Sequence, residues 1–292
     1  MLTRSVRKLI EIPGGPRVDF TLPAGEPALA APDSVSWRVF KNPVALFVGG
    51  VTAVILELAE PRVRSGVWDH STFRTDPLTR LKRTGLAAMV TVYGARSVAE
   101  AMIAGVGRQH ARVSGQTPDG AAYRADDVDL LNWVQATASF GFMEAYSALV
   151  SPLTDAEKDQ FYAEAAPAAR LYGALGAPAS RAAWEAQLAA MTPRLEPSGI
   201  VLEFLTLMRE TKIAPGAVNL LQRPLIRAAV WLVPAQVRDL LELGPEWTPR
   251  PFELKAIQLA GRMADRIAVP GAPPALACQR MGLPADWLYR RP

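Results

Sequence analysis

Histidine is the first residue type to consider in this sequence, because haem, non-haem iron, zinc and general-base chemistry all draw on imidazole. The chain of 292 residues contains only two, His70 and His110. His110 stands at helical spacing from Val98, Met102 and Val106, which predicts a helix that points this imidazole inward along an apolar stripe. Taken alone, this pattern favours a buried, hydrogen-bonded core histidine over a metal ligand.

A non-haem iron site of two histidines and one carboxylate can be assembled from His70, His110 and an acid such as Asp69. The two histidines lie on different segments without metal-ligand spacing, so this alternative stays weak. The stretch Val67-Trp68-Asp69-His70-Ser71 precedes a predicted helix, and its Asp and Ser are local hydrogen-bond formers that favour a turn. We therefore interpret His70 as a structural residue.

Arg80 and Thr84 are four residues apart and share one side of a predicted helix, where they could reach a buried anion together. The alternative is an amphipathic border, in which the Arg stem covers the core and the Thr hydroxyl bonds to a backbone carbonyl. Gly49 and Gly50 interrupt an apolar helix, which indicates the close approach of another backbone or of a flat cofactor. Close helix packing explains the glycines equally well.

Apolar periodicity and capping residues predict a protein built from helices. The predicted helices cover 43–60, with Asn42 as N-cap and Pro61 ending it, 76–94, 95–113, 126–150, 154–173, 180–192, 197–211, 217–243 and 250–268. The helix at 126–150, capped by Asp126 or Asp127, is apolar on nearly all sides and is expected at the centre. Residues 116–124 are rich in turn formers, and no strand pattern of convincing length is present.

These patterns predict an all-α protein with one large helical domain over residues 36–292. Residues 1–35 are dense in Pro and Gly and predict an irregular N-terminal arm that wraps the domain. Hydrophobic residues make up 50% of the chain, which is enough to bury a core without disulfides or structural zinc.

Charge and composition narrow the environment and the partners. The 32 Lys and Arg residues exceed the 28 Asp and Glu residues only slightly and are scattered, so nucleic acid is a poor candidate partner. The longest apolar run, 44–56, is shorter than the roughly 20 residues that span a bilayer, and residues 1–13 do not form a secretory signal. The one cysteine, Cys278, suits a reducing compartment. We expect a cytoplasmic protein without a transmembrane segment.

Several segments, in register, resemble the family that contains bacterial rubber oxygenases (latex-clearing proteins) and the fungal oxygenase of mycophenolic acid biosynthesis. The resemblance covers residues 25–175 well and the remainder only by its helical character. Its segments are Ala31–Val39, Gly66–Phe73, Arg80–Thr84, His110–Gly115, Pro118–Asp126 and Leu130–Val134.

The resemblance implies an all-helical fold with a globin-like core and a b-type haem whose proximal iron ligand matches His110. It implies that Arg80 and Thr84 face the distal side of the haem or a propionate. Latex-clearing proteins have a lysine that can occupy the distal iron position, whereas this chain has Arg83. A guanidinium stays protonated and does not readily ligate iron, so the distal position should be open, water-bound or filled by another group.

The leading hypothesis is a haem b-dependent oxygenase that activates O₂ and attacks a small, apolar, unsaturated substrate. Its catalytic candidates are Arg80, Thr84 and Arg83, and its cofactor-binding candidates are His110, Arg80, Thr84 and Gln135. Candidates for an apolar lining are Phe40, Phe47, Trp133 and Phe142.

Many relatives have histidine where this chain has Phe40, Glu60 and Gln135. A haem-binding or apolar-ligand-binding protein without turnover is therefore an alternative, and a structural helical domain with an ordinary buried His110 is another. Helical spacing places Gln135 on an apolar stripe that faces the interior.

Overall fold

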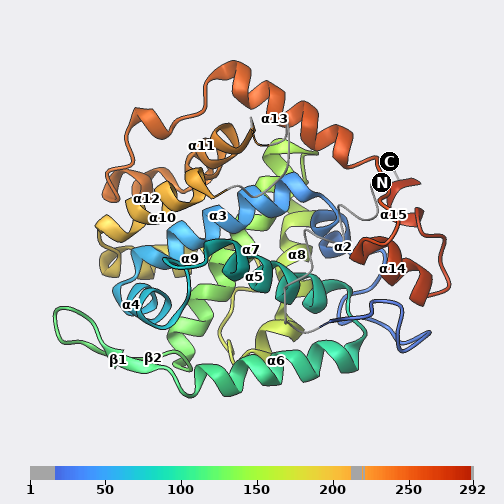
Figure 1. Ribbon diagram of the computed structural model, residues 1–292, viewed down its shortest axis with the longest axis horizontal. Helices are drawn as coiled ribbons and strands as arrows, with labels where there is room; N and C mark the ends of the chain where they lie inside the picture. The colour runs from blue at the N-terminus through green and yellow to red at the C-terminus, as the bar shows by residue number, and fades with distance from the viewer. Residues whose placement is uncertain (1–16, 212–218, 220, 291–292) are drawn as a thin grey trace.

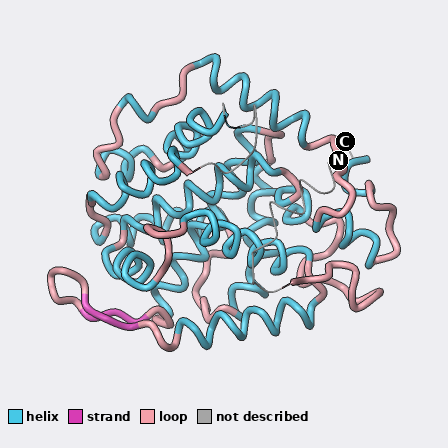
Figure 2. Tube along the Cα trace, in the orientation of Figure 1, coloured by secondary structure: helices cyan, strands magenta, loops and turns pink. Residues whose placement is uncertain are grey.

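The computed structural model describes residues 17–211, 219 and 221–290. The fold is mostly α-helical, with one small antiparallel hairpin among these residues, as Figures 1 and 2 show. Two long helices, α3 (Pro43–Ala59) and α7 (Val128–Leu149), pack against each other along most of their length and form the centre of the core. The predicted central position of the helix near 126–150 is confirmed.

The crossing of α3 and α7 depends on two glycines. A Cβ atom on Gly49 would lie 2.7 Å from the backbone oxygen of Gly141, and a Cβ on Gly141 would press equally into the backbone of Gly49. The two helix backbones are in contact there, so glycine is required on both sides. The reason for Gly49 is therefore close helix packing, and not the approach of a flat cofactor.

Local signals position α3 and α7 as the sequence predicts. The side chain of Asn42 accepts hydrogen bonds from the backbone N–H groups of Val44 and Ala45, at 3.0 and 3.1 Å, and so caps α3. Asp127 caps α7 in the same way, accepting from Asp129 and Leu130. Each cap satisfies N–H groups that a helix start leaves without partners.

The other elements surround this pair. They include α2 (Val35–Phe40), α4 (Pro61–His70), α5 (Pro77–Tyr93), α6 (Arg96–His110) and α8 (Asp155–Leu171), with the hairpin β1 (Ser114–Gln116) and β2 (Ala122–Arg124). The remaining elements are α9 (Arg181–Met191), α10 (Gly199–Glu210), α11 (Gln222–Leu232), α12 (Ala235–Leu240), α13 (Pro251–Ala264), α14 (Pro273–Arg280), α15 (Trp287–Arg290) and the short 3₁₀ turns Thr192–Arg194 and Pro245–Trp247. The capping box of Thr154 and Glu157 opens α8 as predicted.

Several predicted boundaries are wrong. The expected helix over 217–243 is broken by Pro234, which lacks an N–H group, so α11 ends at Leu232 and α12 begins at Ala235. Residues 217, 218 and 220 of that prediction lie outside the described residues. Pro61 follows the end of α3 but also occupies the first position of α4, where a proline is well tolerated.

Three further differences concern short elements. The stretch Val67–His70 is the last turn of α4 and not a loop. The third predicted helix stops at His110, because residues 114–116 leave it to pair with 122–124 across the turn-rich segment. The helices α14 and α15 were not predicted at all.

The described part of the N-terminal arm is irregular and is held by the C-terminal region. The N–H of Gly25 donates to the Arg280 carbonyl at 2.8 Å, and the Arg280 guanidinium donates to the carbonyls of Phe20 and Glu26, both at 2.9 Å. The arm also accepts a backbone hydrogen bond from Arg96 at the start of α6. Residues 1–16 of the predicted arm lie outside the described residues.

Within the described ranges, no single helix is long and apolar enough to cross a membrane. The adjacent helices α3 and α4 meet the criteria of length and composition only when they are taken together, and they are bent by 111° where they join.

Candidate functional site

His110 is the last residue of α6, and its side chain is half-buried. Burial lowers the pKa of this imidazole, the positive charge of Arg80 lowers it further, and the carboxylate of Asp126 partly opposes both. Among the described residues, the His110 side chain has no hydrogen-bond partner. The imidazole is therefore neutral at pH 7 and keeps a ring nitrogen lone pair that can bind a metal or accept a proton.

Arg80 lies on α5, and its positive charge acts on His110. Its guanidinium contacts the Thr84 hydroxyl, which in turn donates to the Arg80 backbone carbonyl at 3.1 Å. The guanidinium also lies over the ring of Phe73, with 5.3 Å between its central carbon and the ring centroid. Burial lowers the pKa of Arg80, and the negative charge of Glu57 opposes this effect. The predicted pairing of Arg80 with Thr84 is present in the structure.

Glu57 is a further polar group of this site, and the sequence analysis did not identify it. It lies on α3 between the fully buried Leu56 and Leu58, yet its own side chain is only half-buried. Burial raises the pKa of the Glu57 carboxyl to about 7, against the opposing effects of the Arg80 charge and of a hydrogen bond with Thr137. A carboxyl group with this pKa can take up or release a proton near neutral pH.

The helices that carry Glu57 and Arg80 have different main neighbours. The close neighbours of α5 are α2, α6 and α14, whereas α3 packs mainly on α7, α11 and α4. Glu57 on α3 and Arg80 on α5 each keep solvent-accessible surface, although most side chains on α3 are buried. Arg80 interacts electrostatically with Glu57 on α3 and with His110 at the end of α6, so the three side chains lie in one region of the molecule.

The other predicted site residues lie less centrally. Arg83 and Thr84 are exposed on α5, and Gln135 is half-buried on α7, two residues before Thr137. The sequence analysis expected Gln135 to face the interior, and its partial burial agrees with that position.

Two of the aromatic residues that were proposed as a substrate lining, Phe40 and Trp133, are packed in the core instead. Phe40 contacts Phe142, with ring centroids 4.7 Å apart. The Trp133 indole donates to the Leu56 carbonyl at 3.2 Å and has no exposed surface. A fully buried side chain cannot line an accessible pocket, so the assignment of Trp133 is wrong; Phe47 and Phe142 are half-buried.

Glu60 occupies one of the positions where relatives have histidine, and here it is structural. It is buried and caps α4 by accepting a hydrogen bond from the backbone N–H of Val63 at 2.8 Å. It also accepts from the Arg62 side chain at 2.9 Å and from Arg194 at 3.2 Å. These pairings satisfy the charge of a carboxylate that has almost no contact with water.

His70 is exposed and is hydrogen-bonded to the Tyr123 hydroxyl at 3.1 Å. This contact joins α4 to the hairpin strand β2, in agreement with the structural role predicted for His70. No cluster of three His, Cys, Asp or Glu side chains that could hold a metal ion occurs in the described ranges. The alternative of an iron site with two histidines and one carboxylate therefore has no support there.

The fold and the site together describe a helical protein in which three half-buried polar groups, the His110 imidazole, the Arg80 guanidinium and the Glu57 carboxyl, lie in one region. Residues 37–263 match the model of the family described as ER-bound oxygenase mpaB/B'/rubber oxygenase, catalytic domain. The chain belongs to this oxygenase family, as its sequence resemblance indicated. No curated protein and no solved structure matches the sequence.

Proposed function

We propose that the protein is a haem b-dependent oxygenase that acts on a small, apolar, unsaturated substrate, with His110 as the proximal iron ligand. Membership of an oxygenase family supports an oxidoreductase activity. The observation that carries the haem assignment is the half-buried, neutral His110 imidazole, which has no partner among the described residues and lies near Arg80.

The residues present fit a b-type haem. A single protein imidazole suffices to hold haem iron, and the half-buried His110 lies within the electrostatic influence of Arg80. The guanidinium of Arg80 can neutralise a propionate through charge-assisted hydrogen bonds. When bound, the haem would supply the activation of O₂. The globin-like arrangement and the cytoplasmic location expected from the sequence are parts of this proposal.

Asp126 completes the support for His110. Its charge acts on the imidazole, and it is held by the Arg124 side chain at 2.8 and 2.9 Å. A carboxylate near a ligand histidine can orient the ring and raise its basicity. This acid could not be identified from the sequence alone.

Glu57 supplies the means of moving a proton in the site. With a pKa of about 7, its carboxyl group can take up and release a proton near neutral pH. Arg80 stays protonated and holds positive charge beside it. Thr84 orients the Arg80 guanidinium, and the exposed Arg83 adds positive charge without contributing an iron ligand.

Haem or apolar-ligand binding without turnover is the second candidate function. This function is favoured because Glu60 stands where relatives have histidine and cannot take over the role of an imidazole. Its carboxylate already caps α4 and pairs with Arg62 and Arg194. Gln135 cannot exchange protons near neutral pH. Glu57 would then be a half-buried acid without a catalytic role.

Oxygen uptake separates the two candidate functions. The haem-loaded protein is mixed with small unsaturated hydrocarbons in an oxygen-electrode cell, with His110→Ala and Glu57→Gln measured beside it. The proposal predicts substrate-dependent oxygen consumption that His110→Ala abolishes and that Glu57→Gln lowers by about 10²-fold or more, the usual contribution of a general acid–base group. If the protein binds one haem per chain but consumes no oxygen with any alkene or polyene, its function is ligand binding without turnover.

A further inference from the structure

The outer face of α13 carries a row of exposed apolar side chains. Phe252, Leu259 and Met263 are 65%, 60% and 57% exposed, and Ile267, just beyond the helix end, is 55% exposed. With the exposed Ala256, the helical members fall within a sector of about 60° around the helix axis. We call these residues the α13 ridge. Large apolar side chains gathered in this way mark a surface that binds another apolar surface.

The opposite face of α13 fixes the ridge toward solvent. A Cβ on Gly261 would lie 2.7 Å from the backbone oxygen of Leu149, so α13 is pressed against the end of α7. The Asn42 side chain donates to the Gly261 carbonyl at 2.9 Å, and the Gln258 side chain donates to the Ala148 carbonyl at 3.1 Å. In Figure 1, α13 runs along the periphery of the molecule, at the top of the view.

The charged side chains exposed on the outer face of α13 itself are of one sign, whereas the exposed Glu246 lines a smaller hollow with Arg223 and Arg227. Lys255, Arg262 and Arg266 are exposed along one side of it. Both acidic residues of this stretch are turned inward, where Glu253 pairs with Arg227 at 2.8 Å and Asp265 pairs with Lys41 at 3.1 Å. The outer face of α13 therefore presents apolar and cationic side chains together.

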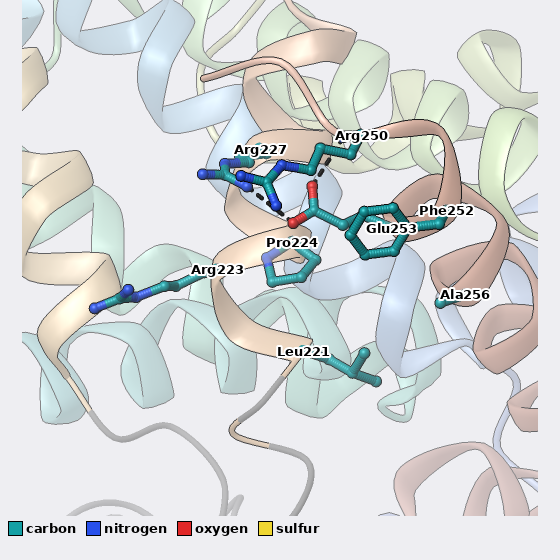
Figure 3. A pocket seen from close by; sticks show the side chains of 8 residues that line it. All are labelled: Leu221, Arg223, Pro224, Arg227, Arg250, Phe252, Glu253 and Ala256. Carbon is teal, nitrogen blue, oxygen red and sulfur yellow. Dashed lines mark hydrogen bonds and ion pairs between the residues drawn. The ribbon is translucent and has the colours of Figure 1, made fainter. Parts of the chain in front are cut away.

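A hollow of about 480 Å³ adjoins the beginning of the ridge and is separate from the candidate oxygenase site. Phe252 and Ala256 belong to both the ridge and the hollow, as Figure 3 shows for the lining side chains. Glu253 in its wall is already satisfied, by the Arg227 side chain and by the backbone N–H of Arg250. The hollow is lined by Leu221, Arg223, Pro224, Arg227, Arg250, Phe252, Glu253 and Ala256.

Two guanidinium groups remain in this hollow after Glu253 has been paired with Arg227. Neither Arg223 nor Arg250 forms an ion pair with any residue that the structure describes. Guanidinium groups of this kind bind phosphate oxygens through paired hydrogen bonds.

We propose that the α13 ridge and the arginine-lined hollow form a docking surface for an anionic phospholipid bilayer. The apolar side chains would enter the boundary between headgroups and acyl chains, the mode of a helix that lies in the membrane interface. Arg223 and Arg250 would bind headgroup phosphates, and Lys255, Arg262 and Arg266 would lie over the anionic surface. This inference does not rest on haem binding.

The charge pattern favours a bilayer over a second copy of the chain. A symmetric dimer brings the same patch of each copy face to face, so the cations Lys255, Arg262 and Arg266 of both copies would gather at one interface without an opposite charge between them. An anionic lipid surface instead neutralises all of them.

Vesicle co-sedimentation of the full chain tests the apolar part of the docking surface. Wild type should bind phosphatidylcholine vesicles that contain about 30% phosphatidylglycerol, and bind vesicles of pure phosphatidylcholine far more weakly. The variant Leu259→Gln/Met263→Gln should lower the partition coefficient on the anionic vesicles by about tenfold or more. The matched control is Leu171→Gln/Leu175→Gln, which changes two exposed leucines with the same spacing elsewhere.

A second pair of variants tests the charges. Arg223→Gln/Arg250→Gln should weaken binding to the anionic vesicles by about five-fold for each charge removed. The control Arg108→Gln/Arg112→Gln removes the same net charge from exposed positions at the end of α6, and it should bind like wild type. All these changes are at the surface, so thermal unfolding of each variant should stay close to that of wild type.

Three results would overturn the proposal. One is wild-type protein that stays in the supernatant with anionic vesicles. Another is equal vesicle binding by the ridge or hollow variants and by their matched controls. Net charge alone, and not this surface, would then explain the binding to anionic vesicles. The third is a wild-type dimer in light scattering that Leu259→Gln/Met263→Gln converts to a monomer, because a second copy would then be the occupant of the ridge.

Discussion

Substitution of Glu57 by glutamine tests the site through protein stability, without substrate or cofactor. Burial on α3 raises the pKa of the Glu57 carboxyl from 4.5 to about 7. The folded protein therefore holds the Glu57 proton more tightly than the unfolded chain does. The stabilisation from this group is fully present below about pH 4.5 and is lost as the pH rises through about 7. A pKa difference of this size corresponds to about 3 kcal/mol.

Urea unfolding of the haem-free protein measures this contribution. Between about pH 4.5 and pH 8, the free energy of unfolding of wild type should fall by about 3 kcal/mol more than that of Glu57→Gln. Glutamine preserves the shape and hydrogen bonding of the protonated acid but cannot ionise, so the variant lacks this pH dependence. Glu100→Gln changes an exposed acid on α6 and should follow wild type. Parallel pH profiles for wild type and Glu57→Gln would refute the assignment of Glu57 as a buried titrating group.

Two other predictions concern packing and proton exchange. Gly49→Ala should lower the free energy of unfolding by about 1–3 kcal/mol or more, because its Cβ would overlap the Gly141 backbone; Gly85→Ala, with open space around it, should raise it by up to about 1 kcal/mol. Equal effects of the two changes in urea unfolding would contradict the helix-crossing argument. Gln135→His should change the pH dependence of the haem absorbance spectrum without loss of fold, and identical pH profiles would place Gln135 outside the reactive site.

The helical architecture could be predicted because local signals and burial agree. Asn42, Asp127 and Thr154 cap helices at the predicted positions, and the all-round apolar character of the segment near 126–150 matches its central place in the core. The errors arise where one signal has two meanings. Proline both ends a helix and begins one, which explains α4, and it also divides long periodic segments, as at Pro234.

The candidate site could be predicted only in part. Helical spacing brought Arg80 and Thr84 together, and it placed His110 on a partly buried stripe. His110 and Arg80 interact across two different helices. Helical periodicity describes the faces of a single helix, so it cannot predict such an interaction. Glu57 was missed, although it is the one charged residue in the apolar helix α3 and could have been noticed for that reason. Trp133 was misassigned because an apolar stripe does not distinguish a core from a pocket lining.

The central claim is that His110 holds a haem iron, and a haem titration tests it most directly. Purified wild type, His110→Ala and His70→Ala are titrated with haem b and followed by the Soret absorbance. We predict one haem per chain for wild type and for His70→Ala, and loss of stoichiometric binding for a still folded His110→Ala. Wild type that binds no haem, or a His110→Ala variant with unchanged haem content and spectrum, would contradict the assignment.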